Sequence, residues 1–229
     1  CARLASAAEE AVAAAGRLSS APRGWLRVSA TVAFGHAVLV PALPDLLVRY
    51  PELRVDLALL DRNVDLADEG YDLVLRFTDR PPEGLVARRL AGVESVLCAS
   101  PDYLARRGWP QMPADLAGHN CVRQDHPQPA VEWQLDGPAG PERVPVDGNV
   151  VVSGSEAVRG LVLAGLGCAV LPGFMVAADL AAGRLERLLP GHAPRGRFGN
   201  LYALYLPSRQ GNPKVRACID WLVETLERP

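Results

Sequence analysis

The chain has 229 residues, of which 49% are hydrophobic and 22% charged, the balance of a globular protein with one large or two modest domains. This composition excludes a disordered or collagen-like chain. The 24 basic and 26 acidic residues give a formal net charge of -2, so no overall positive charge attracts the chain to nucleic acid or anionic lipid. We therefore do not expect the chain by itself to bind DNA well.

The cysteines and histidines form neither a disulfide nor a metal pattern. The five cysteines are far apart, lack C-x-x-C spacing and mostly lie in apolar runs, which is typical of small buried side chains in a reducing cytoplasm. The four histidines share no H-x-x-H spacing, so no metal site is expected.

Apolar stretches are short and broken by glycine, and Glu9, Glu10 and Arg17 interrupt the start of the chain. Neither a membrane span nor a signal peptide is expected.

Residues 1–20 are rich in alanine, and apolar residues recur there at alternating spacings of three and four. This repeat is that of a coiled-coil seam. We interpret the segment as the end of a longer linker helix that pairs two copies of the chain and stops before Pro22 and Gly24. An ordinary surface helix is the alternative.

From residue 25 onward, strands and helices are predicted to alternate, as in βαβ units of a parallel sheet. Strands are expected at residues 25–29, 53–59, 71–77 and 93–99. A helix is expected through Leu39 to Leu47 with a kink at Pro41, a short helix at residues 64–69, and a third at residues 101–108.

The second half begins with a Pro- and Gly-rich stretch, for which a hairpin around Asp136-Gly137-Pro138 is predicted. The alternation then returns, so two α/β lobes are expected. The predicted strands are residues 149–152, 167–171, 185–189 and 201–206, and the predicted helices are residues 155–164, 173–182 and 213–228. The last helix has one strong apolar stripe, which predicts docking on a sheet or a partner.

No catalytic or cofactor motif is found. The chain has no G-x-S-x-G elbow and no P-loop. Gly165-x-Gly167 lies between a predicted helix and a strand, so it is interpreted as a helix C-cap and turn rather than a dinucleotide site. Asp61 and Asp65 are four residues apart, a spacing that would suit an acid–base pair. Carboxylates at this spacing on a helix face are usually solvated instead.

Hydroxyl side chains follow several predicted strands where helices begin. They are Thr31, Ser100 and Ser153, the last in a Ser-Gly-Ser-Glu sequence typical of a capping box. Each residue can be a simple helix cap, but ligands of open α/β sheets bind at these strand ends, where free N–H groups favour anions. Arg76, near the end of the strand at 71–77, can bind a carboxylate there or form an ion pair with Asp79 or Asp72.

The order and spacing of many short segments resemble the effector-binding half of LysR-type transcriptional regulators. The likeness covers residues 24–227, and residues 1–20 resemble the end of the linker helix of that family. The segments that carry it are Gly24-Trp25-Leu26-Arg27-Val28-Ser29, Arg49-Tyr50-Pro51, Glu69-Gly70-Tyr71-Asp72-Leu73, Ala99-Ser100-Pro101-Asp102-Tyr103-Leu104, Leu163-Ala164-Gly165-Leu166-Gly167 and Pro213-Lys214-Val215-Arg216-Ala217.

The resemblance implies an α/β fold of two Rossmann-like lobes of the type II periplasmic-binding-protein kind, preceded by a linker helix. Lobe I would comprise residues 24–98 and 207–229, and lobe II residues 99–206, with crossovers near 97–100 and 206–208. A small effector, often an anionic metabolite, would bind between the lobes. Thr31 matches the hydroxyl position of the family after the first strand and Arg76 its cleft arginine, while Asp61, Ser100 and Ser153 are further candidates.

The resemblance also implies a homodimer or tetramer in the cytoplasm that contacts DNA through a helix-turn-helix domain upstream of this sequence. Neither an enzymatic activity, a cofactor nor a metal is implied. Two alternatives remain at this point. A solute-binding protein of a transporter would share the lobes, and a two-lobed α/β enzyme is a weaker alternative because no nucleophile and base can be identified.

Overall fold

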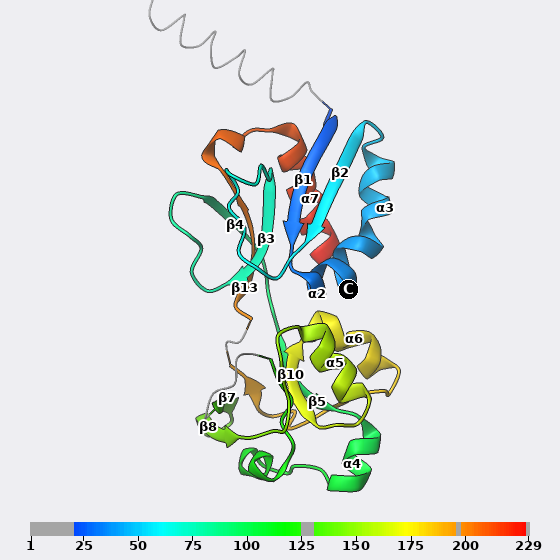
Figure 1. Cartoon of the computed structure of the whole chain (residues 1–229), viewed down its shortest axis with the longest axis vertical. Helices are drawn as coiled ribbons and strands as arrows, with labels where there is room; N and C mark the ends of the chain where they lie inside the picture. The colour runs from blue at the N-terminus through cyan, green and yellow to red at the C-terminus, as the bar shows by residue number, and fades with distance from the viewer. Residues whose placement is uncertain (1–20, 125–130, 196–197, 228–229) are drawn as a thin grey trace, which may run out of the picture. The chain divides into compact units, whose positions relative to one another are not determined.

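The computed structural model describes residues 21–124, 131–195 and 198–227. The linker helix expected at residues 1–20 lies outside these residues. Contacts within the chain divide it into two compact units: unit 1 comprises Cys1–Ala91 and Asn200–Pro229, and unit 2 comprises Gly92–Gly199. An α/β architecture of two lobes, each with its own sheet, is therefore observed (Figure 1).

The expected lobe boundaries at residues 98/99 and 206/207 differ from those of the two units. Strand β5 (Ser95–Ala99) pairs antiparallel with β10 (Cys168–Pro172) and β11 (Glu186–Arg187), so it belongs to unit 2. Strand β13 (Asn200–Tyr205) pairs antiparallel with β3 (Leu73–Thr78) of unit 1. Both crossovers therefore come earlier in the chain than expected. The apolar pattern locates a strand but does not say which strand it pairs with.

Unit 1 contains a five-stranded sheet in the order β2-β1-β3-β13-β4. Strand β1 (Gly24–Ala30) is parallel to β2 (Leu53–Leu59) and β3 (Leu73–Thr78), whereas β13 runs antiparallel to β3. Strand β4 (Val86–Gly92) lies at the edge and was not predicted, because its sequence alternates weakly.

Helices cover one face of this sheet, where Leu26, Val28 and Leu73 are buried. Helix α7 (Pro213–Glu227) buries the predicted stripe of Val215, Cys218, Ile219 and Leu222. The other helical run consists of α2 (Val32–Phe34), a π-helical turn (Gly35–Leu39) and α3 (Val40–Arg49).

The predicted irregularity at Pro41 takes the form of this π-helical turn. The Val40 N–H donates to the carbonyl of Gly35, five residues back, directly before the proline.

Residues Val32–Arg49 also meet the length and mean hydropathy, 1.4, of a membrane-spanning helix, which the sequence analysis did not expect. Phe34, Leu39 and Leu46 are nevertheless buried in unit 1, and the Phe34 ring packs edge-on against Phe77 of β3. In all, 22% of this 18-residue window is buried, so the helix packs against unit 1 along one side and exposes most of its remaining surface.

The other face of the sheet in unit 1 is covered by loops. The helix predicted at residues 64–69 is wrong, since Leu66 to Gly70 form a turn. The Oδ1 atom of Asp65 accepts the N–H groups of Ala67 and Asp68 at 2.8 and 3.0 Å. An aspartate that caps its own following residues stabilises a turn in place of a continuing helix.

Unit 2 contains a sheet in the order β10-β5-β11 and a second sheet, β12-β7-β8, built on a hairpin. The predicted hairpin is confirmed as β7 (Val131–Gly137) and β8 (Gly140–Val146), and one of its faces buries Trp133 and Val144. The remaining elements are helices α4 (Pro101–Arg107), α5 (Ser155–Leu163) and α6 (Gly173–Ala181), a 3-10 helix (Pro113–Gly118), and the short strands β6 (Arg123–Gln124), β9 (Val151–Val152) and β12 (Ala193–Pro194).

Two smaller predictions concern cysteine and glycine positions. Cys98, Cys121, Cys168 and Cys218 are free and buried, as expected, while Cys1 lies outside the described residues. Gly165 follows the last residues of α5 with a φ of 77°, and its N–H donates to the carbonyl of Val162. This left-handed position ends the helix, which confirms the interpretation of Gly165-x-Gly167 as a C-cap.

Candidate functional site

Three of the five predicted site residues lie at one edge of the sheet in unit 1. Ala30, the last residue of β1, pairs with Leu59 of β2 and with Leu75 of β3. Thr31 and Arg76 therefore follow paired positions, and Asp61 comes two residues after Leu59. Because these strands are parallel, their carboxyl ends meet at this edge, where ligands of open α/β sheets bind.

Thr31 precedes helix α2, but its side chain does not cap the helix. The Oγ1 atom of Thr31 is buried and has no hydrogen-bond partner among the described residues. The Oδ1 atom of Asp61 instead accepts the N–H of Val32 at 3.0 Å. Since buried hydroxyls are nearly always hydrogen-bonded, the free Oγ1 of Thr31 is an available donor and acceptor.

Arg76 is a partly buried cation whose hydrogen-bond acceptors are all neutral. Its guanidinium donates to the Leu75 carbonyl at 2.9 Å, to Ser29 Oγ at 3.0 Å and to the Arg62 carbonyl at 3.3 Å. Burial lowers the pKa of Arg76 below its usual value, although the charge of Asp61 acts in the opposite direction. A guanidinium in such surroundings keeps its charge and gains from a nearby anion.

The alternative ion pairs of Arg76 are not formed. Among the residues that the structure describes, Arg76 makes a salt bridge with neither Asp79 nor Asp72. The carboxylate of Asp72 accepts the N–H of Arg27 at 3.0 Å and lies 3.3 Å from Arg209 Nε. Asp72 therefore already has a cationic partner at the other end of the strand.

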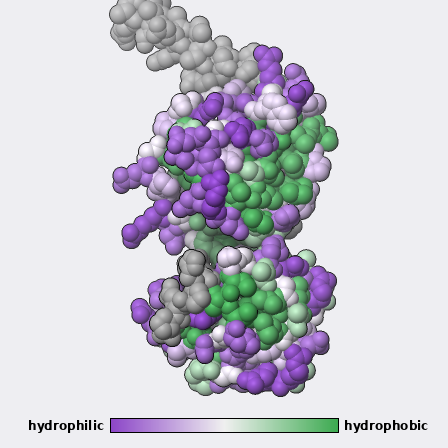
Figure 2. Space-filling model, viewed as in Figure 1, coloured by the Kyte–Doolittle hydropathy of each residue, from purple (hydrophilic) through white to green (hydrophobic). Residues whose placement is uncertain are grey.

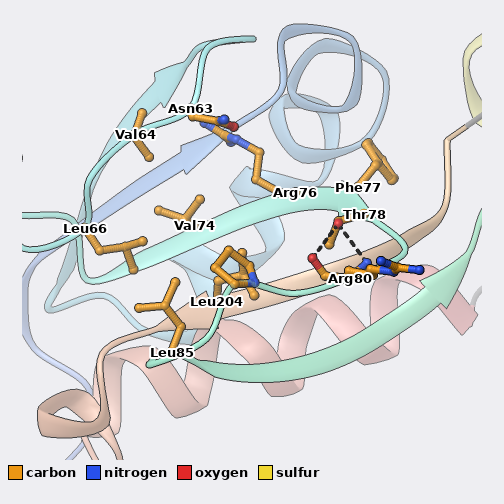
Figure 3. A pocket seen from close by; sticks show the side chains of 11 residues that line it. Asn63, Val64, Leu66, Val74, Arg76, Phe77, Thr78, Arg80, Leu85 and Leu204 are labelled. Carbon is orange, nitrogen blue, oxygen red and sulfur yellow. Dashed lines mark hydrogen bonds between the residues drawn. The ribbon is translucent and has the colours of Figure 1, made fainter.

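Beside Arg76, a cavity of about 420 Å³ opens on the loop-covered face of the sheet. Figure 3 shows aliphatic side chains from β3, β13 and two loops pointing toward one another, while the side chain of Arg76 extends toward Asn63. Arg80 and Thr78 lie at another part of the wall, joined by two backbone hydrogen bonds of the Thr78 hydroxyl. None of the described lining residues is acidic. The aliphatic residues are Val64, Leu66, Val74, Leu85 and Leu204.

The loop that contributes Asn63, Val64 and Leu66 to this cavity contains an ion pair. Arg62 donates to Glu69 through Nη1 at 2.8 Å and Nη2 at 2.6 Å. The hydrogen bond from Arg62 lowers the pKa of Glu69 to about 2. Glu69 is therefore ionised and already paired, so it does not supply the missing carboxylate for Arg76.

Ser100 and Ser153 belong to unit 2. Ser100 is buried, and its Oγ accepts the N–H of Tyr103 at 3.4 Å as the cap of helix α4. Ser153 is exposed and is not a cap, because helix α5 begins at Ser155 with Gly154 in the N-cap position. The predicted capping box at Ser153 is therefore wrong. Ser155 Oγ, two residues later, donates to Gln124 Oε1 at 2.7 Å.

The sequence analysis did not identify Ser29, Arg62 or the cavity residues. Ser29 is the penultimate residue of β1, and its contact with Arg76 depends on the strand register β1·β3. Arg62 lies in a bend just before the segment that was assigned to a helix. In the described part of the chain, no group of three or more His, Cys, Asp or Glu side chains is placed to hold a metal ion.

Comparison with known proteins then decides the family. Residues 19–227 match the LysR substrate binding domain. This chain belongs to the LysR family of transcriptional regulators. The HTH-type transcriptional regulator DmlR of Escherichia coli K12 is 34% identical over 204 residues, which are 88% of this chain and 65% of that protein. The probable HTH-type transcriptional regulator LtrA of Klebsiella pneumoniae is 31% identical over 98% of this chain and 73% of its own length.

Solved structures agree with this assignment. CrgA, a LysR-type transcriptional regulator from Neisseria meningitidis, has a TM-score of 0.82 and 29% identity, covering 99% of this chain and 77% of its own. The regulatory domain of AphB from Vibrio vulnificus has a TM-score of 0.71 and 27% identity over 90% of this chain. The two units of this LysR domain therefore have the α/β fold of the type II periplasmic-binding-protein kind. The chain spans 65% of the length of DmlR.

Proposed function

We propose that this LysR chain is the ligand-sensing part of a cytoplasmic transcription regulator and that its effector is a small anionic metabolite. One observation carries the proposal. At the edge of the sheet where the parallel strands end, the buried Thr31 hydroxyl has no hydrogen-bond partner and the partly buried Arg76 has no carboxylate partner. An arginine of this kind favours carboxylate or phosphate groups over neutral ligands.

The five candidate residues have different roles in this proposal. Thr31 and Arg76 contact the effector, and Asp61 fixes the start of helix α2 beside them. Ser100 and Ser153 remain candidates from unit 2, with Ser100 also acting as a helix cap. Ser153 is exposed and its hydroxyl can still donate to a ligand.

Signal transmission follows from differential affinity. An effector that binds one arrangement of a regulator better than another shifts the population toward it, with couplings of roughly 1–3 kcal/mol being typical. The shift would reach DNA through a helix-turn-helix domain outside this sequence and through an oligomer. In support of an oligomer, Val40, Leu47 and Val48 expose their side chains on α3. Figure 2 shows apolar side chains gathered over this helix.

A thermal-shift screen of carboxylates, aromatic acids and amino acids on the full chain tests the proposal. A ligand at 100 times its dissociation constant adds about 2.7 kcal/mol to the free energy of unfolding. We expect acids to raise the melting temperature and the variants Arg76→Gln and Thr31→Val to reduce that effect. The matched controls Arg54→Gln and Thr225→Val change the same residue types elsewhere in unit 1 and should retain it. Acid responses that survive Arg76→Gln unchanged would refute the assignment of this site.

A further inference from the structure

The cavity beside Arg76 restricts the shape of a ligand as well as its charge. Seven of its eleven lining residues are apolar, five of them aliphatic, while Asn63, Thr78, Arg76 and Arg80 are polar. Leu66, Val74 and Leu204 also belong to a cluster of buried apolar residues, with Val64 and Leu85 packed against it. The cavity is therefore an opening into an apolar core, with a guanidinium at one side (Figure 3).

We propose that the effector is a monocarboxylate with a compact hydrocarbon body, which lies in this cavity while its carboxylate contacts Arg76. This inference rests on the proposed function and defines the ligand class of the same site. The cavity volume of about 420 Å³ falls within the range of roughly 300–1,000 Å³ that is usual for small-molecule sites.

The free donors of Arg76 support a carboxylate. A guanidinium has five N–H donors, and the three hydrogen bonds of Arg76 use one hydrogen of Nη1 and both of Nη2. Nε and the second Nη1 hydrogen have no acceptor among the described residues; they lie on different edges of the guanidinium, so a carboxylate would take one of them. An amide or alcohol at this place would accept a hydrogen bond but would leave the partly buried positive charge uncompensated.

The aliphatic wall argues against polyhydroxylated or polyacidic effectors. Hydroxyl groups or a second carboxylate placed against Val64, Leu85 and Leu204 would face aliphatic carbon, away from the polar Asn63 and Thr78 of the wall, which disfavours binding. The other cation of the wall, Arg80, is exposed, and an exposed arginine attracts a second carboxylate only weakly because water screens it. One charged end and one apolar end therefore fit the site best.

Calorimetric titration of the full chain with benzoate, 3-methylbutanoate, lactate and the uncharged isostere benzamide tests this ligand class. We expect the two apolar acids to bind at least about tenfold more tightly than lactate or benzamide, the loss typical of a missing charged hydrogen bond or an unpaired buried hydroxyl. Thermal shifts at matched ionic strength provide a second readout.

Two variants separate the cavity from the charge. Leu85→Trp fills the cavity from a partly buried loop position and should abolish binding of both apolar acids while leaving Arg76 in place. Arg76→Gln should weaken them by about tenfold or more. Leu161→Trp, which enlarges a partly buried leucine on α5 in unit 2, is the matched control and should leave their affinity unchanged.

The outcomes distinguish this inference from the proposed function. Tighter binding of lactate than of benzoate, or benzoate binding that Leu85→Trp leaves intact while Arg76→Gln removes it, overturns the apolar monocarboxylate and leaves the anion-sensing site standing. Binding of the apolar acids that ignores Arg76→Gln overturns both. No measurable binding of either apolar acid to the unmodified chain also overturns the inference.

Discussion

Two charged side chains, one in each unit, have opposite surroundings. In unit 2, Asp179 on α6 has 0% exposure and is held by Arg159 at 2.6 Å and Arg184 at 2.7 Å. In unit 1, Arg76 is partly buried and has only neutral acceptors. A fully paired internal charge contributes to the fold, because removing its partners leaves it uncompensated. A cation without a carboxylate partner is left available for a ligand. The contrast predicts that Asp179 stabilises the fold whereas Arg76 binds a ligand.

The largest expected effect on the free energy of unfolding is that of replacing Asp179. Asp179→Asn should lower the free energy of unfolding by roughly 3 kcal/mol, since it breaks a pair with a buried member, a loss moderated by the partial exposure of both arginines. Urea denaturation at neutral pH measures it. Asp220→Asn, at an exposed ion pair with Arg88, is the control and should change stability far less. Equal losses in the two variants would remove the distinction between structural and surface charge.

The same carboxylate should make unit 2 sensitive to acid. Burial alone would raise the pKa of Asp179, but the hydrogen bonds from Arg159 and Arg184 outweigh it and lower that pKa below its ordinary value. A folded-state pKa below the unfolded value contributes stability above the unfolded pKa, near 3.9 for aspartate, and this stability is lost as the pH falls through the folded value. The difference in stability between the wild type and Asp179→Asn should therefore shrink on acidification below about pH 4. A difference that stays constant down to acid denaturation would contradict this linkage.

The cap at Ser100 should have an intermediate effect. Ser100→Ala removes the acceptor of the Tyr103 N–H at the start of α4 and should cost about 1 kcal/mol. Ser153→Ala, at the exposed serine that caps no helix, should leave the free energy of unfolding unchanged within error. A similar loss at both serines would mean that Ser153 has a structural contact that its position does not suggest.

The smallest effect on stability is expected at Arg76. Arg76→Met removes three hydrogen bonds to neutral acceptors and also removes the burial of an uncompensated charge, so the free energy of unfolding should change by less than about 1 kcal/mol. Chemical denaturation without added ligand measures this, and the same variant should lose its response to acids. A loss as large as that of Asp179→Asn would show that Arg76 is a structural charge after all.

The sequence was sufficient for the elements with strong periodicity. The apolar stripe of α7, the hairpin around Gly137 and the alternation of β2 all lie where their spacing predicts them. The turn after Asp65 was missed because the side chain of that aspartate competes with helix formation, an effect that apolar spacing does not report. The assignment of β5 and β13 to the wrong lobes has a different cause, since partner choice depends on contacts distant in sequence.

The site was predictable in part for the same reasons. Thr31 and Arg76 were proposed because strand ends can be located from the sequence, and Asp61 as a further candidate; all three lie near the carboxyl ends of strands that pair in register. That the Thr31 hydroxyl is free and that Arg76 has only neutral acceptors could not be predicted, because both depend on which atoms other segments place nearby. The cavity was missed for a further reason: its wall combines β3, β13 and two loops whose conformations are set by local hydrogen bonds.

The position of β13 in the sheet also bears on the order of events during synthesis. This strand lies between β3 and β4, yet the ribosome makes it only after the whole of unit 2, which is one continuous segment. Unit 2 can acquire its native contacts while unit 1 still lacks a central strand and helix α7. Domains generally fold as they emerge, and contacts between distant segments form late. Unit 1, whose synthesis starts first, is therefore the unit whose folding is completed last. Until β13 has been synthesised, the edge of β3 is open to incorrect pairing.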